Sequence, residues 1–178
     1  MAPPIASRIN LFQGDITTLD CHAIVTAANT ALCGGGGVDG AVHDAAGPEL
    51  VHASMALAPC PAGDARITAG FALAARFVIH AVGPIFHDIE TDRETLANAY
   101  TASLTLAADN DVHSIAFPCI STGAFGFPPD SACKIAITAV LQWLQSHEQP
   151  HRVTFCCFRP DDHRRYAMRL NELGVVDL

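Results

Sequence analysis

A run of four glycines followed closely by an aspartate is the segment of this 178-residue sequence best suited to chemistry. It reads Gly34-Gly-Gly-Gly-Val-Asp-Gly-Ala-Val-His43. Glycine tolerates positive φ and lets a ligand approach the main chain closely. Asp39 falls in or just before the first turn of a helix that we expect from Val38 to the Gly47-Pro48 pair. We therefore expect a ligand to meet backbone here beside a carboxylate, although Asp39 alone is equally consistent with a helix-dipole contact.

The same glycines formally match a dinucleotide-binding fingerprint, Gly35-x-Gly37-x-x-Gly40. The preceding strand is expected to end near Asn29, several residues too early for the tight strand–turn–helix unit of that motif. An acidic residue at the close of a second strand is also missing, and no Gly-Lys-Ser/Thr sequence of a Walker loop occurs. A nicotinamide-dependent oxidoreductase is therefore disfavoured.

A second loop with small residues is Pro118-Cys-Ile-Ser-Thr-Gly-Ala-Phe-Gly-Phe-Pro128, between a buried strand and a long helix. Hydroxyl residues and glycines at a strand-to-helix junction favour a phosphate cradle built from N–H donors. Ser121 lacks the G-x-S-x-G setting of a nucleophile, and a buried strand thiol such as Cys119 is normally inert.

Two further positions follow expected strands. Asp15, in Gln13-Gly-Asp-Ile-Thr17, is either a turn or cap residue or an acceptor for an exocyclic amine such as that of adenine. Phe158 is either core or a stacking surface for a base. Asn29 is either a turn residue that tolerates left-handed geometry or part of a site.

These loops are positioned by alternating strands and helices, which indicate an α/β sandwich with a largely parallel central sheet. Such sheets bind ligands at the carboxyl ends of their strands. A capping box, Thr91-Asp-Arg-Glu94, predicts the start of a helix whose buried face carries Leu96, Ala99, Tyr100, Ser103, Leu104 and Ala107. A second helix carries Ala132, Ile135, Ala136, Ala139, Val140, Trp143 and Leu144 on one face, and a last one is expected over 161–173. The expected strands are Ile9–Gln13, Ala23–Ala28, Ala65–Thr68, Phe77–Val82, Ser114–Cys119 and Val153–Phe158.

Composition narrows the possible functions. Half of the residues are hydrophobic, the net charge is −8, and Lys134 is the only lysine beside nine arginines. Sequence-general nucleic-acid binding needs many cationic contacts and is disfavoured. No apolar run is long enough to span a membrane. Residues 1–7 are expected to be a flexible leader, and residues 8–178 one domain.

Seven cysteines without a C-x-x-C pair suit free thiols in a reducing compartment, so we expect a cytoplasmic location. Neither a cofactor nor a metal is expected: among the nine histidines there is no H-E-x-x-H, and Cys33 and His43 alone make no recognisable ligand set.

Taken together, the motifs resemble the macrodomain family, in particular its MacroD-type branch of ADP-ribose hydrolases. The quoted loops, together with Ile24-Val-Thr-Ala-Ala-Asn29, Ala45-Ala-Gly-Pro48 and Val78-Ile-His-Ala-Val-Gly-Pro84, occur in the family order. The resemblance implies a three-layer α/β/α sandwich with a mixed, largely parallel sheet. It covers essentially everything after the first seven residues.

The resemblance also implies roles for residues. Asp15 and the Ile16 amide would bind adenine beside Phe158. Asn29 would hold hydroxyls of the distal ribose, and Asp39 would help to deprotonate a water there, which makes Asn29 and Asp39 the expected catalytic residues. Phe125 would press on the distal ribose. The backbone that would close over the diphosphate is that of Gly34, Gly35, Gly36, Gly37, Val38, Ser121, Thr122, Gly123, Ala124 and Phe125.

The implied activity is removal of mono-ADP-ribose from acidic side chains of proteins and deacetylation of O-acetyl-ADP-ribose, by a chain expected to be monomeric. The alternatives are a non-catalytic ADP-ribose reader and a regulatory module acting through protein contact. Compared with the family, Thr26 replaces a usual Asn, Thr30 a common Pro, and Phe125 a frequent Tyr. Asn29 and Asp39 are retained.

Overall fold

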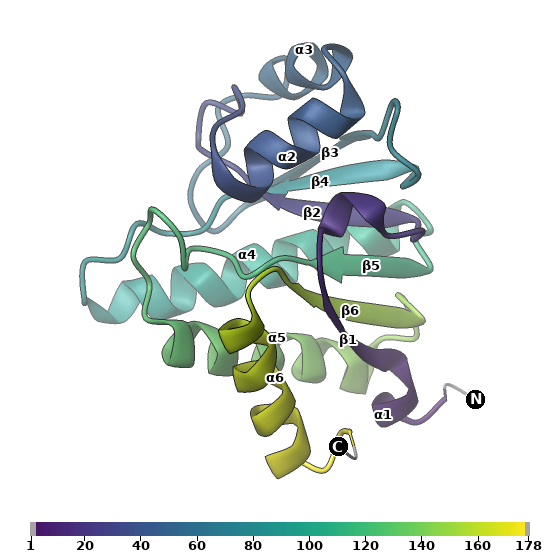
Figure 1. Cartoon of the computed structure of the whole chain (residues 1–178), viewed down its shortest axis with the longest axis vertical. Helices are drawn as coiled ribbons and strands as arrows, with labels where there is room; N and C mark the ends of the chain where they lie inside the picture. The colour runs from purple at the N-terminus through teal and green to yellow at the C-terminus, as the bar shows by residue number, and fades with distance from the viewer. Residues whose placement is uncertain (1–2, 177–178) are drawn as a thin grey trace.

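A computed structural model describes residues 3–176 of the chain as one six-stranded sheet between two layers of helices (Figure 1). The sheet order is β1-β6-β5-β2-β4-β3, and all neighbours are parallel except β3 with β4. The expected mixed, largely parallel sandwich is confirmed. The strands are β1 (Ile9–Gln13), β2 (Ala23–Ala27), β3 (Ala65–Ala69), β4 (Phe77–Ala81), β5 (Ser114–Phe117) and β6 (Arg152–Cys157).

The two faces of the sheet bury different side chains, as alternation along a strand requires. On one face the strands pack against α4, α5 and α6 in the larger core, which includes Ile115, Phe117 and Phe155. On the other face Ile24, Val78 and Ala116 pack beneath α2 and α3. The helices are α1 (Ile5–Arg8), α2 (Gly37–Ala46), α3 (Glu49–Met55), α4 (Glu90–Asp109), α5 (Pro129–Ser146) and α6 (Pro160–Glu172), with a 3-10 turn η1 (Ile16–Thr18). None of the helices among the described residues is long and apolar enough to cross a membrane.

Helix periodicity predicted the buried face of α4 correctly, but the expected capping box was wrong. The helix begins at Glu90, and the side chain of Asp92 accepts hydrogen bonds from the backbone of His87 and Ile89. Thr91 and Glu94 are exposed. A cap depends on the path of the preceding loop, which the local pattern Thr-x-x-Glu does not encode.

Several expected strands end one or two residues early. The run Ser114–Cys119 leaves the sheet after Phe117, and Val153–Phe158 leaves it after Cys157. Past β5 the apolar run continues because Ile120 is still buried in the larger core. The loops that follow these strands are where the candidate site lies.

Residues 5–7 of the expected leader belong to α1, and Ile5 packs against the larger core. Residues 1 and 2 lie outside the described residues. The boundary between leader and domain stays a prediction.

Candidate functional site

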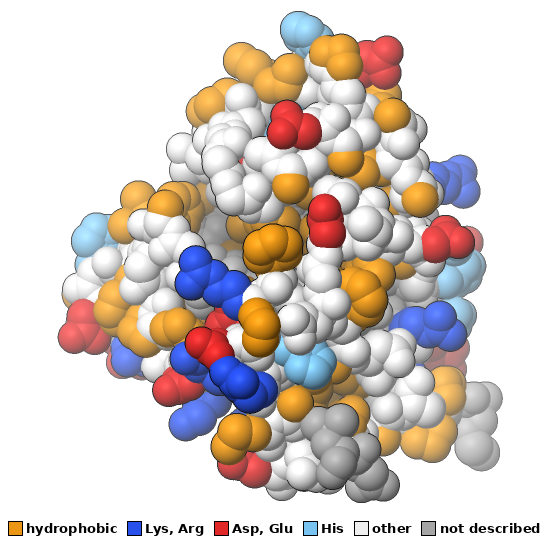
Figure 2. Space-filling model, in the orientation of Figure 1, with side chains coloured by type: hydrophobic (Ala, Val, Ile, Leu, Met, Phe, Trp, Pro, Cys, Tyr) orange, Lys and Arg blue, Asp and Glu red, His pale blue; other side chains and the backbone are white. Residues whose placement is uncertain are grey.

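The parallel strands bring the candidate loops to one edge of the sheet, in a definite order. Asp15 follows β1, Phe158 follows β6, the 118–128 loop follows β5, and Asn29 follows β2. These four strands are neighbours in that order. With a strand spacing of about 4.8 Å, the loops span roughly 14 Å along the edge. Viewed from the side of α2, the surface is hollowed beside the start of that helix (Figure 2).

At the β1 end, Asp15 caps the 3-10 turn η1. Its Oδ1 accepts hydrogen bonds from the Thr17 amide at 2.9 Å and the Thr17 hydroxyl at 2.7 Å. Its Oδ2 and the Ile16 amide have no hydrogen-bond partner within residues 3–176. Capping and ligand binding are therefore compatible, because they use different atoms.

Phe158 lies beside this turn, since the Gly14 amide donates to the carbonyl of Cys157 at 3.0 Å. The Phe158 side chain is 77% exposed. It is therefore not a core residue, and an exposed ring at a strand end is available for stacking.

The loop after β5 turns sharply at Ser121, whose φ of +67° is unusual for a residue with a side chain. The turn is closed by the Phe127 amide donating to the Ser121 carbonyl and the Gly126 amide donating to the Gly123 carbonyl. The amides of residues 122–125 have no acceptor among the described residues. Such a row of free N–H groups is the device by which backbone binds anions.

The glycine loop before α2 is held by Asn29. The Asn29 side chain accepts a bond from the Cys33 amide at 3.3 Å and donates to the Gly34 carbonyl at 2.8 Å. Gly34 and Gly37 have φ of +82° and +58°, a region of backbone conformation that favours glycine. The amides of Gly34, Gly35 and Gly36 have no acceptor within the described part of the chain.

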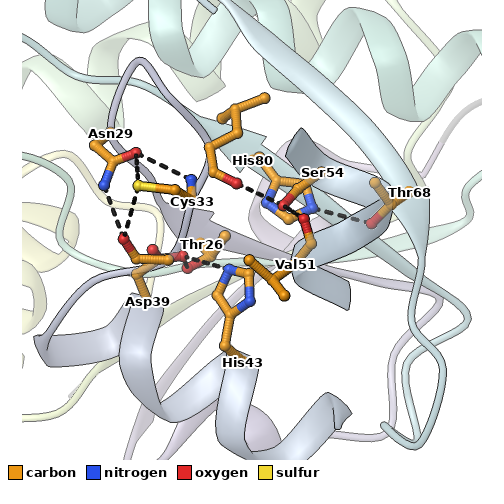
Figure 3. Close-up of polar contacts among 11 residues, drawn as sticks. Thr26, Asn29, Cys33, Asp39, His43, Val51, Ser54, Thr68 and His80 are labelled. Carbon is orange, nitrogen blue, oxygen red and sulfur yellow. Dashed lines mark hydrogen bonds and ion pairs between the residues drawn. The ribbon is translucent and has the colours of Figure 1, made fainter. Parts of the chain in front are cut away.

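Asp39 lies in the first turn of α2 and is only 4% exposed. Its Oδ1 accepts a hydrogen bond from the Thr26 hydroxyl at 2.8 Å and lies 3.5 Å from Nε2 of His43 (Figure 3). Its Oδ2 lies on the side of the glycine loop: a Cβ added to Gly35 would meet it at 3.7 Å. One oxygen is therefore fixed inside, and the other lies beneath the loop.

Burial raises the pKa of Asp39, because the charged form loses solvation, while the Thr26 hydrogen bond and the His43 ring oppose the rise. A carboxylate with a raised pKa is a stronger base once ionised. The arrangement can thus bind an anion through amides and present a basic oxygen beside it.

Two residues near Asp39, His80 and Thr68, were not expected from the sequence. His80 on β4 is fully buried and pairs with the hydroxyl of Thr68 on β3 at 2.9 Å. Thr26 and His80 are register partners across β2 and β4. A polar residue inside an otherwise apolar strand was the available signal for His80. Its partner Thr68, however, comes from β3, the edge strand that pairs with β4, and the sequence does not show that pairing.

Comparison with known proteins places the chain and its fold in a family. The sequence model of the Macro domain matches residues 25–136. The chain is 46% identical over 176 residues to the Homo sapiens protein named ADP-ribose glycohydrolase MACROD2, covering 97% of this chain and 41% of that protein. It is 51% identical over 165 residues to a macro domain-containing protein of Ralstonia nicotianae, covering 92% of this chain and 95% of that protein. A mutant of the Oceanobacillus iheyensis macrodomain, solved with ADPR, superposes with a TM-score of 0.91 at 39% identity, covering 98% of both chains.

This chain therefore belongs to the Macro domain family. It spans about two fifths of the length of the MACROD2 proteins it matches.

Proposed function

We propose that this chain binds ADP-ribose and hydrolyses the ester that joins it to an acidic side chain or to an acetyl group. The observation that carries the proposal is Asp39: a buried carboxylate with one oxygen fixed by Thr26 and the other beneath a loop of free amides. Support comes from MACROD2, which is named an ADP-ribose glycohydrolase, and from the Oceanobacillus macrodomain solved with ADPR.

The proposed ligand lies along the carboxyl edge of the sheet. Adenine binds between Asp15 and the exposed ring of Phe158, and the diphosphate is held by amides of residues 34–38 and 121–125. The distal ribose then lies above Asp39. This assignment follows the sheet order, and it uses main-chain dipoles in a protein whose net charge is −8 and which has a single lysine.

In the proposed reaction on a protein ester, water attacks the anomeric carbon of the distal ribose. The bond from that carbon to the ester oxygen breaks, the acidic side chain leaves as a carboxylate, and Asp39 accepts the proton of the water. Asn29 acts chiefly by fixing the Cys33–Gly34 turn, because both ends of its amide are bonded to that turn. Binding of a ribose hydroxyl by Asn29 would share the Oδ1 that the Cys33 amide uses.

The alternative is a reader that binds ADP-ribose without turnover. We favour the enzyme because a pure reader has no need of a buried carboxylate, which costs stability. We also propose that the protein acts in the cytoplasm, in keeping with its seven free cysteines.

The test compares the wild-type chain with Asp39→Ala and Asp39→Asn. On a protein carrying mono-ADP-ribose on glutamate, both substitutions should lower the hydrolysis rate by about 10²–10⁴-fold, the range typical of a lost general base. Calorimetry should find ADP-ribose binding largely retained, since the amide donors remain. Unchanged turnover in Asp39→Ala would remove Asp39 from the mechanism, and a stable label on wild-type protein would favour the reader.

A further inference from the structure

Three lone-pair donors converge in the interior behind the glycine loop. They are a carboxylate oxygen of Asp39, a ring nitrogen of His43 and a ring nitrogen of His80, and these atoms all lie within 4.8 Å of one another. Asp39 and His43 are one turn apart on α2, whereas His80 comes from β4 (Figure 3). The fold, and not the local sequence, assembles this set.

Thr68 engages one ring nitrogen of His80, and its second contact favours one tautomer. The Thr68 hydroxyl lies 3.1 Å from the Ala69 carbonyl, which can only accept a hydrogen. When the hydroxyl donates there, its oxygen accepts a hydrogen from Nε2 of His80, 2.9 Å away. In this tautomer Nδ1 of His80 carries a lone pair.

That lone pair is buried without a partner. The His80 side chain is fully buried, and Nδ1 has no hydrogen-bond partner within residues 3–176. Burial lowers the pKa of His80 to about 4, so the ring stays neutral near pH 7. A buried acceptor left without a donor is costly, and such an atom in a folded protein calls for an explanation.

We propose that Asp39, His43 and His80 form a binding site for a divalent transition-metal ion, with zinc as the best fit. Two neutral imidazoles and one carboxylate are a ligand set that zinc uses in proteins, with a fourth position left for water. To bind the ion through Nε2, His43 would carry its ring hydrogen on Nδ1. The three donors would contract around the ion, and His43 is the least buried of the three.

Two outer contacts of such a site are already present. Metal-binding histidines usually donate their second N–H to an oxygen, which fixes the tautomer, and Thr68 performs this for His80. The Thr26 hydroxyl similarly bonds the carboxylate of Asp39. His43 also borders a surface hollow that Asp44, Gly47, Pro48 and Val51 line.

An ion at this site would occupy the carboxylate of Asp39. Zinc should therefore inhibit the hydrolysis proposed above. This consequence rests on the proposed function, whereas the binding of zinc does not.

The test is calorimetry of the chelator-treated chain with zinc chloride, for the wild type and for His80→Gln. Glutamine can reach Thr68 with an N–H donor but offers no lone pair where Nδ1 lies. We expect the wild type to bind one zinc ion per chain. His80→Gln should bind zinc more than about tenfold less tightly, because removing a metal ligand should weaken binding more than removing a residue that only orients a ligand. ADP-ribose binding by His80→Gln serves as the check on folding.

A matched control disrupts a second group of histidines, away from the proposed site. His113 stacks on His151 and contacts His22, and this group could also attract zinc. His113→Gln should leave the buried site intact. Cobalt(II) gives a second readout, since a visible band without a thiolate charge-transfer band indicates nitrogen and oxygen ligands and excludes the cysteines.

Zinc affinity equal in the wild type and His80→Gln would overturn the proposal, as would an absence of binding heat or a cobalt spectrum of thiolate type. If His80→Gln fails to bind ADP-ribose, Thr68→Val replaces it, with an expected loss of zinc affinity of about tenfold. Zinc binding without any hydrolase activity would uphold this site and refute the proposed function. Hydrolysis that zinc does not inhibit, together with an absence of zinc binding, would refute this site and leave the proposed function standing.

Discussion

The ionisation of Asp39 is balanced between one unfavourable and two favourable effects. Burial raises its pKa, and the hydrogen bond from Thr26 is the larger of the two effects that lower it. The hydroxyl of Thr26 makes this donation at 2.8 Å. Thr26 thereby supplies the donor that favours the charged form of the buried carboxylate.

Thr26→Val should therefore shift the pH dependence of hydrolysis. Without the hydroxyl, the pKa of Asp39 rises further, so the ionised base is lost at a higher pH as the solution is acidified. The acidic limb of kcat/KM against pH should move to higher pH, while the rate well above that limb changes less. Thr26→Ser keeps the donor and should keep the wild-type profile. An acidic limb that does not move in Thr26→Val would mean that Asp39 does not set it.

At the scale of elements, the start of α2 is built by close packing of backbone on backbone. A Cβ placed on Gly40 would lie 2.7 Å from the carbonyl oxygen of Gly35, so the glycine loop lies directly on the helix. Gly36 differs, since a Cβ there meets nothing within 4 Å and its φ is −96°. Gly40 is therefore needed for close packing of the loop on the helix, whereas the position of Gly36 has room for a side chain.

Gly40→Ala should displace the loop, whereas Gly36→Ala should not. We expect Gly40→Ala to lower the free energy of unfolding by about 1–3 kcal/mol, as overpacking typically does, and to weaken ADP-ribose binding. Chemical denaturation and calorimetry measure the two effects. Gly36→Ala, the control for stability, should unfold close to the wild-type midpoint. Equal stability of both variants would show that the contact with Gly35 carries no constraint.

At the scale of the whole molecule, the sheet order arranges the site, and a buried cation ties α1 to the connection between α5 and β6. Arg8, at the end of α1, is only 1% exposed. Its guanidinium donates to the carbonyls of Leu144, His147, Glu148 and Pro150 at 2.7–3.1 Å. The first residues are thereby joined to the connection between α5 and β6, on the side of the sheet away from the candidate site.

Arg8→Met should destabilise the fold without changing the site. It removes all four donations and leaves buried carbonyls without partners, so we expect the free energy of unfolding to fall by about 2–4 kcal/mol. Urea denaturation measures this loss. ADP-ribose affinity of the folded protein should be unchanged. Arg165→Met, which removes the pairs with exposed Asp130 and partly buried Asp162, should cost less, about 1 kcal/mol. If Arg165→Met lost as much free energy of unfolding as Arg8→Met, burial would not explain the contribution of Arg8.

The sequence by itself determined the layers, the parallel sheet and the loops that meet at its carboxyl edge. Hydrophobic periodicity records which face of an element is buried, and the glycine-rich and Ser121–Phe125 loops carry their own local signals. It also placed Asp39 in the first turn of α2. Element ends were less accurate, as at Thr91 and Cys119, because they depend on loops packed by distant residues.

Only the tertiary structure decided the surroundings of Asp39. Thr26, His80 and Thr68 become neighbours through pairing of β2 with β4 and of β4 with β3. Strand pairing joins residues that are far apart in the chain, and no local periodicity specifies which polar side chains will face one another across it. The sequence therefore offered His43 without a partner, while the folded sheet supplies His80 beside it, fully buried and with one nitrogen free of any hydrogen bond within residues 3–176.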